Sequence, residues 1–304
     1  MTDHVKKAAS KSIILFILLG FSYIAAYFLR LIFARTLTQE QYGLFYAVLG
    51  LINFFIIFRD LGLSETLVKH IPEFQAKKEY EKIKSSIIFV AITQFLIGLI
   101  IVIIFWFLSD YLAVNYFKNI PQNLIQPASL MIKIISASYL FQGFVEVMTL
   151  TLNGFQKTRY YGVKDFLKNF FGLIIVVVLI NYIDKTIVPA IAYFGGIFIT
   201  LIFMIYFFLK SFKFFEYNTK ITKSLIKKFF KYAFQIMLGT GAGLIVGHSN
   251  TILLTYFSGL KSVGAFNIAY PTAVLLVIFA KTFSMVMFPL SSELWIKGAK
   301  EKIQ

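Results

Sequence analysis

Long apolar runs follow one another along the chain, separated by short polar segments. A transmembrane α-helix needs about 20 consecutive, mainly apolar residues, and eight runs approach or exceed that length. Apolar and polar residues do not alternate within these runs, as they would in the strands of a transmembrane β-barrel. The pattern therefore predicts an all-α, polytopic helical bundle. Its expected membrane spans are 12–34, 42–64, 85–108, 129–151, 166–182, 187–209, 232–256 and 266–289.

The composition supports a membrane protein and narrows its chemistry. Of the 304 residues, 59% are hydrophobic and 14% are charged, whereas soluble domains have about 45–50% apolar and about 25% charged residues. A soluble globule of this size would be unable to bury so much apolar surface. The chain has no cysteine, which excludes disulfides and thiolate chemistry. It also lacks the HExxH, P-loop and G-x-S-x-G motifs, so we expect no enzyme activity, no metal and no cofactor.

The net charge of +16 is distributed unevenly along the chain. With the N-terminus in the cytoplasm, 23 lysines and arginines fall in cytoplasmic segments and five in outer segments. Such asymmetry in short loops sets the orientation of membrane proteins. We therefore expect a multi-pass protein of the cell membrane with both termini in the cytoplasm. The basic excess then requires no nucleic-acid partner.

Two of the expected cytoplasmic segments have a helical pattern. In 220–231, Ile221, Leu225 and Phe229 recur at helical spacing among five lysines, and we expect this amphipathic helix to lie on the anionic lipids of the inner leaflet. The alternative is a solvated, charged linker. The second segment, 70–84, mixes glutamates with lysines and is interpreted as a short exposed helix without chemistry.

A faint internal repeat relates the beginning of the chain to its end. The segment Tyr42-Gly43-Leu44-Phe45 resembles Val263-Gly264-Ala265-Phe266, and aligning the two glycines gives an offset of 221 residues. A six-helix unit repeated in parallel orientation is a known transporter plan, although a chance match remains the alternative. The expected domains are a six-helix lobe (1–210), a cytoplasmic amphipathic linker (211–231) and two helices of an incomplete second lobe (232–304).

Polar residues inside the spans are costly in a bilayer and are therefore candidates for function. The amides have interhelical hydrogen bonding as an alternative role, and Arg30 has the alternative of reaching the outer interface. Lys281 lies too deep for that and is expected in a water-filled cavity. The candidates for a substrate cavity are Arg30, Asn53, Gln94, Gln142, His248, Asn250 and Lys281.

Three glycines lie on one face of the seventh expected span. Gly239, Gly243 and Gly247 form a repeated G-x-x-x-G pattern, which is typical of close helix packing. The alternative is a helix that bends during gating.

Several segments resemble one transporter family in their order and spacing. They are ARTLTQEQYGLF at 34–45, DLGL at 60–63, LNGFQK at 152–157, the stretch 250–269 and FPLS at 288–291. These segments are similar to those of the polysaccharide or lipid-linked oligosaccharide flippases, the Wzx-type translocases. That family is part of the multidrug/oligosaccharidyl-lipid/polysaccharide exporter superfamily, and the resemblance covers essentially the whole chain.

The resemblance implies two helical lobes around a central cavity that opens alternately to each side of the membrane. It also implies a cationic lining for the pyrophosphate head of a lipid-linked glycan, which would give Arg30 and Lys281 a purpose. The sequence departs from the family at Asn250, where many members have Asp. The alternatives are a drug or metabolite antiporter of the same superfamily, a membrane-embedded glycosyltransferase or polymerase, and a non-transporting structural subunit.

The number of spans also differs from the family, whose members usually have about twelve to fourteen. The eight expected spans therefore predict an incomplete flippase, either truncated or one half of a split pair. The alternative is a homodimer in which two copies complete each other's cavity.

Overall fold

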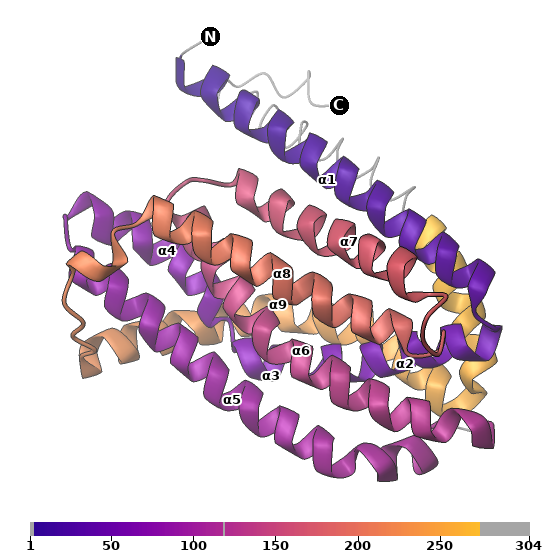
Figure 1. The fold of residues 1–304 in the computed structure, drawn as a ribbon. Coiled ribbons are helices and arrows are strands. Elements are labelled where there is room, and N and C mark those ends of the chain that lie inside the picture. Colours follow the sequence, from indigo (N-terminus) through magenta and orange to yellow (C-terminus); the bar gives the residue numbers. More distant parts are fainter. Residues whose placement is uncertain (1–2, 118, 274–304) are drawn as a thin grey trace, which may run out of the picture.

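The computed structural model describes residues 3–117 and 119–273, and in these ranges the regular structure is entirely helical (Figure 1). A further helical stretch covers 260–273. The labelled helices are α1 (Asp3–Thr36), α2 (Gln39–Phe54), α3 (Ile56–Asp60), α4 (Leu63–Ala76), α5 (Tyr80–Asn115), α6 (Gln122–Gly154), α7 (Arg159–Leu179), α8 (Val188–Ser211), the 3₁₀-helix η1 (Phe214–Glu216) and α9 (Lys223–Ser258).

Five stretches of the described chain are long and apolar enough to cross a membrane. They lie in α1, in α2 together with α3, and in α5, α6 and α8. Helices α7 and α9 have 21 and 36 residues and are not among these five stretches. Most of the eighth expected span, 266–289, lies outside the described residues. The prediction of an all-α, multi-pass membrane protein is confirmed.

Helix α6 lies at the centre of the bundle and packs against α2, α4, α5, α7 and α8. Helix α1 packs mainly against α7, as the indigo and rose ribbons in Figure 1 show. One face of α1 is left with exposed large apolar side chains, among them Phe16, Phe21 and Phe28. Such a face is suited to lipid or to another apolar surface.

The second expected span, 42–64, ends earlier than predicted. Helix α2 stops at Phe54, and α3 continues the run only to Asp60. Leu61 and Gly62 then adopt left-handed φ angles of 50° and 76°, which turn the chain into α4. Because α4 begins a separate helix at Leu63, the apolar run that extends past Asp60 belongs to a different element.

Helix α4 is not the exposed helix that the pattern at 70–84 predicted. Its side chains Leu67, His70, Ile71 and Phe74 are all buried, and the helix packs against α5, α6 and α9. The charged residues that suggested exposure lie near the end of α4, in the turn that follows and in the first turns of α5. Burial of one apolar face is what an amphipathic helix needs for stability.

The segment 220–231 is helical from Lys223 onward, but it continues without a break to Ser258 as α9. The Thr222 hydroxyl accepts a hydrogen bond from the Leu225 N–H and so caps the helix. Leu225 and Phe229 are buried in one hydrophobic cluster with residues of α4. The predicted amphipathic helix therefore packs its apolar face against the protein.

The fifth expected span, 166–182, begins earlier than predicted because α7 starts at Arg159. Gly162 lies against Leu15 and Leu18 of α1, which belong to the first membrane span. The residues that follow Gly162 therefore run alongside the stretch of α1 that is long and apolar enough to cross a membrane. Lys164 and Lys168, which the sequence placed in a cytoplasmic segment, belong to this part of α7.

The two segments paired by the suspected repeat contact each other at the start of α2. A side-chain carbon on Gly43 would overlap the Leu260 carbonyl oxygen, and one on Gly264 would overlap the Gln39 carbonyl oxygen. Gln39 and Leu260 each precede the corresponding glycine by four residues, so the contact is reciprocal. A two-fold relation between the segments would produce this reciprocity.

Candidate functional site

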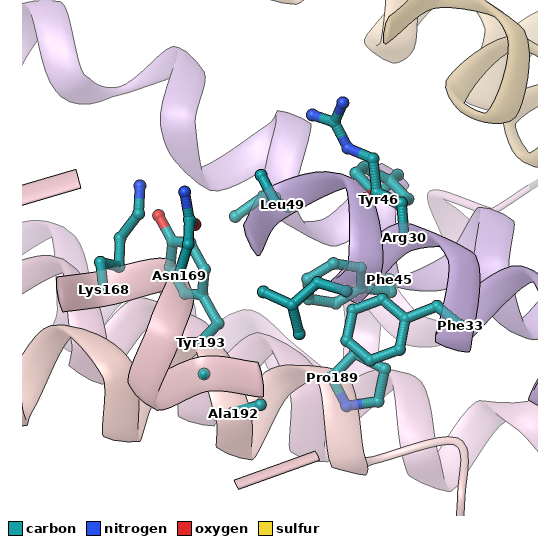
Figure 2. A pocket seen from close by; sticks show the side chains of 13 residues that line it. Arg30, Phe33, Phe45, Tyr46, Leu49, Lys168, Asn169, Pro189, Ala192 and Tyr193 are labelled. Atoms are coloured by element: carbon teal, nitrogen blue, oxygen red, sulfur yellow. The ribbon is translucent and has the colours of Figure 1, made fainter. Parts of the chain in front are cut away.

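A cationic crevice lies among α1, α2, α7 and α8 (Figure 2). We define it by Arg30, Tyr46, Lys168, Asn169 and Tyr193, which line a cavity of about 160 Å³ together with apolar residues. The charged ends of Arg30 and Lys168 project in the same direction in Figure 2. A neighbouring hollow of about 370 Å³ shares Arg30, Lys168 and Asn169 and extends to the stretch 260–273.

Asn169 holds α7 against α1 at the level of this crevice. Its side-chain amide donates to the Ser22 carbonyl at 3.2 Å and to the Ser22 hydroxyl oxygen at 3.0 Å. Lys168 directly precedes Asn169 in α7, so these bonds also hold Lys168 close to α1. Because Ser22 is itself buried, the amide also satisfies a polar group that would otherwise be costly in the membrane.

The positive charges of the crevice have one carboxylate nearby, Asp165, which lines the neighbouring hollow with them and lies 4.0 Å from Lys164. Within the part of the chain that the structure describes, neither Arg30 nor Lys168 makes an ion pair, and both side chains are half-buried. Two cations in a medium of low dielectric attract an anion more strongly than they would in water. The crevice is therefore suited chemically to a phosphate or another compact anion.

An acidic chamber of about 590 Å³ lies between α3, α4, α6 and α9. We define it by Arg59, Asp60, Glu65, Gln142 and Glu146, which supply its polar lining. Apolar residues and two glycines of α9 complete the wall. Three carboxylates and one guanidinium thus face a single cavity.

Arg59 is the most deeply buried charge described, with 2% of its surface exposed. Its Nη1 donates to the Tyr139 carbonyl at 2.6 Å, and its guanidinium lies 4.3 Å from the centroid of the Tyr139 ring. Gly98 and Gly143 flank the side chain, and a Cβ on either glycine would meet its Cδ at 3.6 Å, an ordinary van der Waals contact. Arg59 is therefore bound to α6 and balances only part of the negative charge in the chamber.

Asp60 is held from behind the chamber wall by Gln94 of α5. The Gln94 amide donates to the Asp60 carboxylate at 2.6 Å and also to the Ser64 hydroxyl. The Ser64 N–H donates to the same Asp60 oxygen at 3.3 Å. Gln94 thus fixes the turn between α3 and α4, a more specific role than lining a substrate cavity.

Glu146 and Lys164 form an ion pair that joins α6 to α7. Their charged atoms are 3.0 Å apart, and Lys164 also lies 4.0 Å from Asp165. Only 13% of the Lys164 side chain and 27% of the Glu146 side chain are exposed. Lys164 therefore compensates negative charge at the edge of the acidic chamber.

The predicted amides Asn53 and Gln142 meet at Tyr193. The Tyr193 hydroxyl donates to Gln142 Oε1 at 3.5 Å and is also hydrogen-bonded to the Asn53 side chain. Gln142 lines the acidic chamber and Tyr193 lines the cationic crevice. These amides accordingly connect the walls of the two cavities.

The other predicted residues are scattered. His248 is half-buried and Asn250 exposed on α9, and neither lines the two cavities. Lys281 lies outside the described residues. Side-chain carbons on Gly239, Gly243 or Gly247 would meet no described atom within 4 Å.

The charges that matter most in the two cavities were missed by the sequence reasoning. Arg59, Asp60, Lys164 and Lys168 were attributed to the ends of spans or to loops. One signal was available, because Lys164 and Lys168 are four residues apart and so share a helix face directly before an apolar run. Their burial depends on α1, which no local pattern reveals.

Comparison with known proteins identifies the family. A model of the family described as polysaccharide biosynthesis protein matches residues 8–295. An uncharacterized membrane protein of Methanocaldococcus jannaschii is 32% identical over 287 residues, which are 91% of this chain and 56% of the relative. The chain thus spans about half the length of that curated relative.

Solved transporters share the fold at low sequence identity. An inward-facing multidrug resistance MATE family transporter of the MOP superfamily has a TM-score of 0.66 and 14% identity, over 91% of this chain and 68% of the transporter. A MOP superfamily transporter from Pyrococcus furiosus has a TM-score of 0.62 and 14% identity, over 96% and 72% of the two chains. The chain therefore belongs to the polysaccharide biosynthesis protein family, and its fold is that of MOP superfamily transporters.

Proposed function

We propose that this protein moves a lipid-linked oligosaccharide or polysaccharide precursor across the cytoplasmic membrane by alternating access. The observation that supports this most directly is the cationic crevice, in which Arg30 and Lys168 line one cavity and neither makes an ion pair within the described residues. Membership of the polysaccharide biosynthesis family agrees with a glycan substrate. The resemblance implied this role for Arg30 and Lys281, and Lys168 adds a further cation beside Arg30.

The chemistry of such a substrate matches the crevice. A lipid-linked glycan has a phosphate or diphosphate between its lipid and its sugars, and this charged group must pass through the apolar part of the bilayer. A guanidinium and an ammonium at fixed positions replace the water that the phosphate loses. The lipid remains in the bilayer, so the crevice has only to hold the head group. No bond is made or broken in this process, and the proposal includes no enzymatic step.

The proposed orientation keeps the N-terminus and the loops around α4 in the cytoplasm. Moving Lys164 and Lys168 into the membrane removes two cations from the cytoplasmic count, but a large excess over the five outer cations remains. The basic face of α9 near Lys223 and Lys227 is then close to the inner leaflet, where anionic lipids are proposed partners. A second copy or a second half-transporter also remains a proposed partner.

One observation favours a second candidate function. Three carboxylates gather in the acidic chamber, and proton-driven antiporters need carboxylates within the membrane. The protein is therefore alternatively proposed to be a drug or metabolite antiporter of the same superfamily. A cationic drug and an anionic glycan lipid place opposite demands on the cationic crevice, so one assay separates them.

The test is transport in liposomes. The protein is reconstituted with a fluorescent lipid diphosphate glycan, and the fraction of glycan that reaches a membrane-impermeant lectin is followed with time. We expect Arg30→Ala and Lys168→Ala each to slow transfer about tenfold, because a lost charge-assisted contact of about 1.4 kcal/mol changes binding tenfold. Lys185→Ala, in the exposed turn before α8, is the matched control. Unaltered transfer in the double variant, or uptake of cationic drugs only, would contradict the proposal.

A further inference from the structure

A cavity separate from the crevice and the chamber lies between the end of α5 and the beginning of α6. These two ends lie side by side (Figure 1), and the groove between them has a volume of about 620 Å³. We call it the α5–α6 groove and define it by its polar lining, which is Asp110, Gln122, Gln126, Ser129 and Lys133. Among the described residues, none that lines this groove also lines the crevice or the chamber.

Four of these polar residues form one row along α6. Gln122, Gln126, Ser129 and Lys133 follow one another at spacings of four, three and four residues, which places them on one face of the helix. The two glutamines are exposed, whereas Met131 on the opposite side of α6 belongs to the hydrophobic core. The row therefore faces away from the core and is available to a ligand.

The groove lies at the level of the lipid head groups. Residues 85–109 of α5 are all uncharged, and about 20 such residues cross a bilayer, so Asp110 marks the point where α5 leaves the hydrocarbon. Trp106 and Tyr111 are exposed beside it, as is typical of aromatic residues at a membrane interface. In the proposed orientation, this is the outer surface of the membrane.

Asp110 is held in place but remains open to a ligand. Lys133 Nζ lies 3.7 Å from its Oδ1, and the Ser129 hydroxyl donates to the same oxygen. Trp106 Nε1 donates to the Lys133 carbonyl at 3.1 Å, so the lysine backbone lies at the depth of Trp106 while its ammonium reaches towards the head groups. Because 81% of the Asp110 side chain is exposed, its carboxylate can accept further hydrogen bonds.

The chemistry of the groove fits a sugar better than a phosphate. The charges of Asp110 and Lys133 cancel, so the described lining offers no net attraction to an anion. The amides of Gln122 and Gln126 and the Asp110 carboxylate supply both donors and acceptors, which is what the hydroxyl groups of a sugar require. The volume of the groove also falls within the usual range for small-ligand pockets, about 300–1,000 Å³.

We propose that the α5–α6 groove binds the saccharide head group of a lipid in the adjacent leaflet. The sugar hydroxyls hydrogen-bond to Asp110, Gln122 and Gln126, and the lipid chains lie along the exposed apolar side chains of α5, among them Phe107. The purpose of the groove is to receive a glycan lipid that has left the cationic crevice. That purpose rests on the proposed function, but binding can be measured without transport.

The test uses tryptophan fluorescence as a local readout. The chain has two tryptophans, so Trp295→Phe leaves Trp106, which is hydrogen-bonded to the Lys133 carbonyl beside the groove. This variant is placed in nanodiscs of phosphatidylcholine with a rising fraction of diglucosyl or digalactosyl diacylglycerol. We expect a saturable change in the Trp106 emission with sugar lipid, and none with equal amounts of phosphatidic acid.

Two further variants in the same background locate the binding. Gln126→Ala and Asp110→Asn should each raise the half-saturating fraction of sugar lipid about fivefold, the size of effect expected from one lost hydrogen bond. Asn123→Ala is the matched control, since Asn123 is an exposed amide next to Gln122 that does not line the groove. We expect this control to bind the sugar lipid as the parent does.

No saturable change with either sugar lipid, or an equal change with phosphatidic acid, would overturn the inference. So would binding that Gln126→Ala and Asp110→Asn leave unaltered, because the sugar would then lie elsewhere. If sugar lipid binds but no diphosphate glycan lipid crosses liposomes, the proposed function fails and the groove stands. If glycan lipid crosses and no sugar lipid binds, only the groove fails.

Discussion

Helix α7 places one lysine in the cationic crevice and another beside the acidic chamber, and the surroundings of the two lysines differ. Lys168 lines the crevice and has no ion pair among the described residues. Lys164 lies four residues earlier, about 6 Å along the helix axis, and pairs with Glu146 at 3.0 Å. The nearest carboxylate, and not the type of residue, decides whether a lysine in the membrane is available to a ligand.

The difference extends to the two cavities as wholes. The crevice leaves positive charge free and so suits an anion, whereas the chamber has more carboxylates than cations and so suits a proton or another cation. Tyr193, with Asn53 and Gln142, joins their walls. One bundle thus places an anion site and a cation site side by side, which is what transport of an anionic substrate driven by protons would require.

Reversing the charge of the crevice should have the largest effect. Lys168→Glu replaces attraction to a phosphate by repulsion, and we expect transfer of a diphosphate glycan lipid to fall at least about 100-fold, since like charges in contact cost several kcal/mol. Lys168→Arg should retain most of the activity. Lys185→Glu, in the exposed turn before α8, controls for net charge, and a loss of equal size in that variant would argue against the crevice.

Removing the paired lysine should damage the fold instead. Lys164→Ala leaves Glu146 without its partner, and we expect the free energy of unfolding to fall by about 3 kcal/mol, the lower end for a buried pair that loses one member. The measurement is thermal or denaturant unfolding in detergent. Lys168→Ala should leave stability nearly unchanged, and Lys164→Met with Glu146→Gln should recover much of the loss. Equal losses at the two lysines would remove the distinction between the cavities.

The sequence predicted the helical class and most spans because long apolar runs report directly on the membrane. The segments around Gly43 and Gly264, which it paired as a suspected repeat, lie in reciprocal contact, although the match itself did not predict that contact. It placed Arg30 in an apolar run, and Arg30 does lie in a stretch of α1 that is long and apolar enough to cross a membrane. These features depend on local hydropathy or on a short match, and both are visible without the fold.

The burial of the remaining charges was not predictable in the same way. Lys164 and Lys168 precede an apolar run, which is the usual pattern of residues that flank a membrane span. Their helix, α7, nevertheless packs along α1, which lies about 140 residues earlier in the chain. Arg59 ends an apolar run and is nevertheless enclosed by α5 and α6. Hydropathy averages over a window, whereas burial depends on which distant helix packs against the residue.

The bend before α4 offers a smaller test of how the chamber is built. Gly62→Ala would place a side chain at a φ of 76° and against the Ala233 carbonyl oxygen, so we expect a loss of about 2 kcal/mol in stability and a displaced α9. Gly20→Ala in α1 is the matched control, because nothing lies within 4 Å of its added carbon. A harmless Gly62→Ala would show that the bend is not pressed against α9.

The smallest expected effects concern the two glutamates at opposite ends of α4, which should respond to pH with opposite signs. Hydrogen bonds from Lys228, His70 and Lys77 lower the pKa of Glu73 to about 2. The stabilisation that Glu73 provides is therefore complete above about pH 4.3, the ordinary pKa of a glutamate. It is lost as the pH falls through about 2.

Glu65 behaves in the opposite way, because its pKa is raised. Its contribution is favourable below about 4.3 and is lost as the pH rises through the raised value. At pH 7, Glu73→Gln should therefore destabilise the protein and Glu65→Gln should stabilise it, each by less than about 1 kcal/mol because both side chains are partly open to solvent. Unfolding of both variants at pH 7 and pH 4 decides the question. If Glu65→Gln instead destabilises the protein at pH 7, the folded state prefers the ionised form of Glu65. The acidic chamber would then differ from the cationic crevice in its residues, but it would bind a proton no more readily.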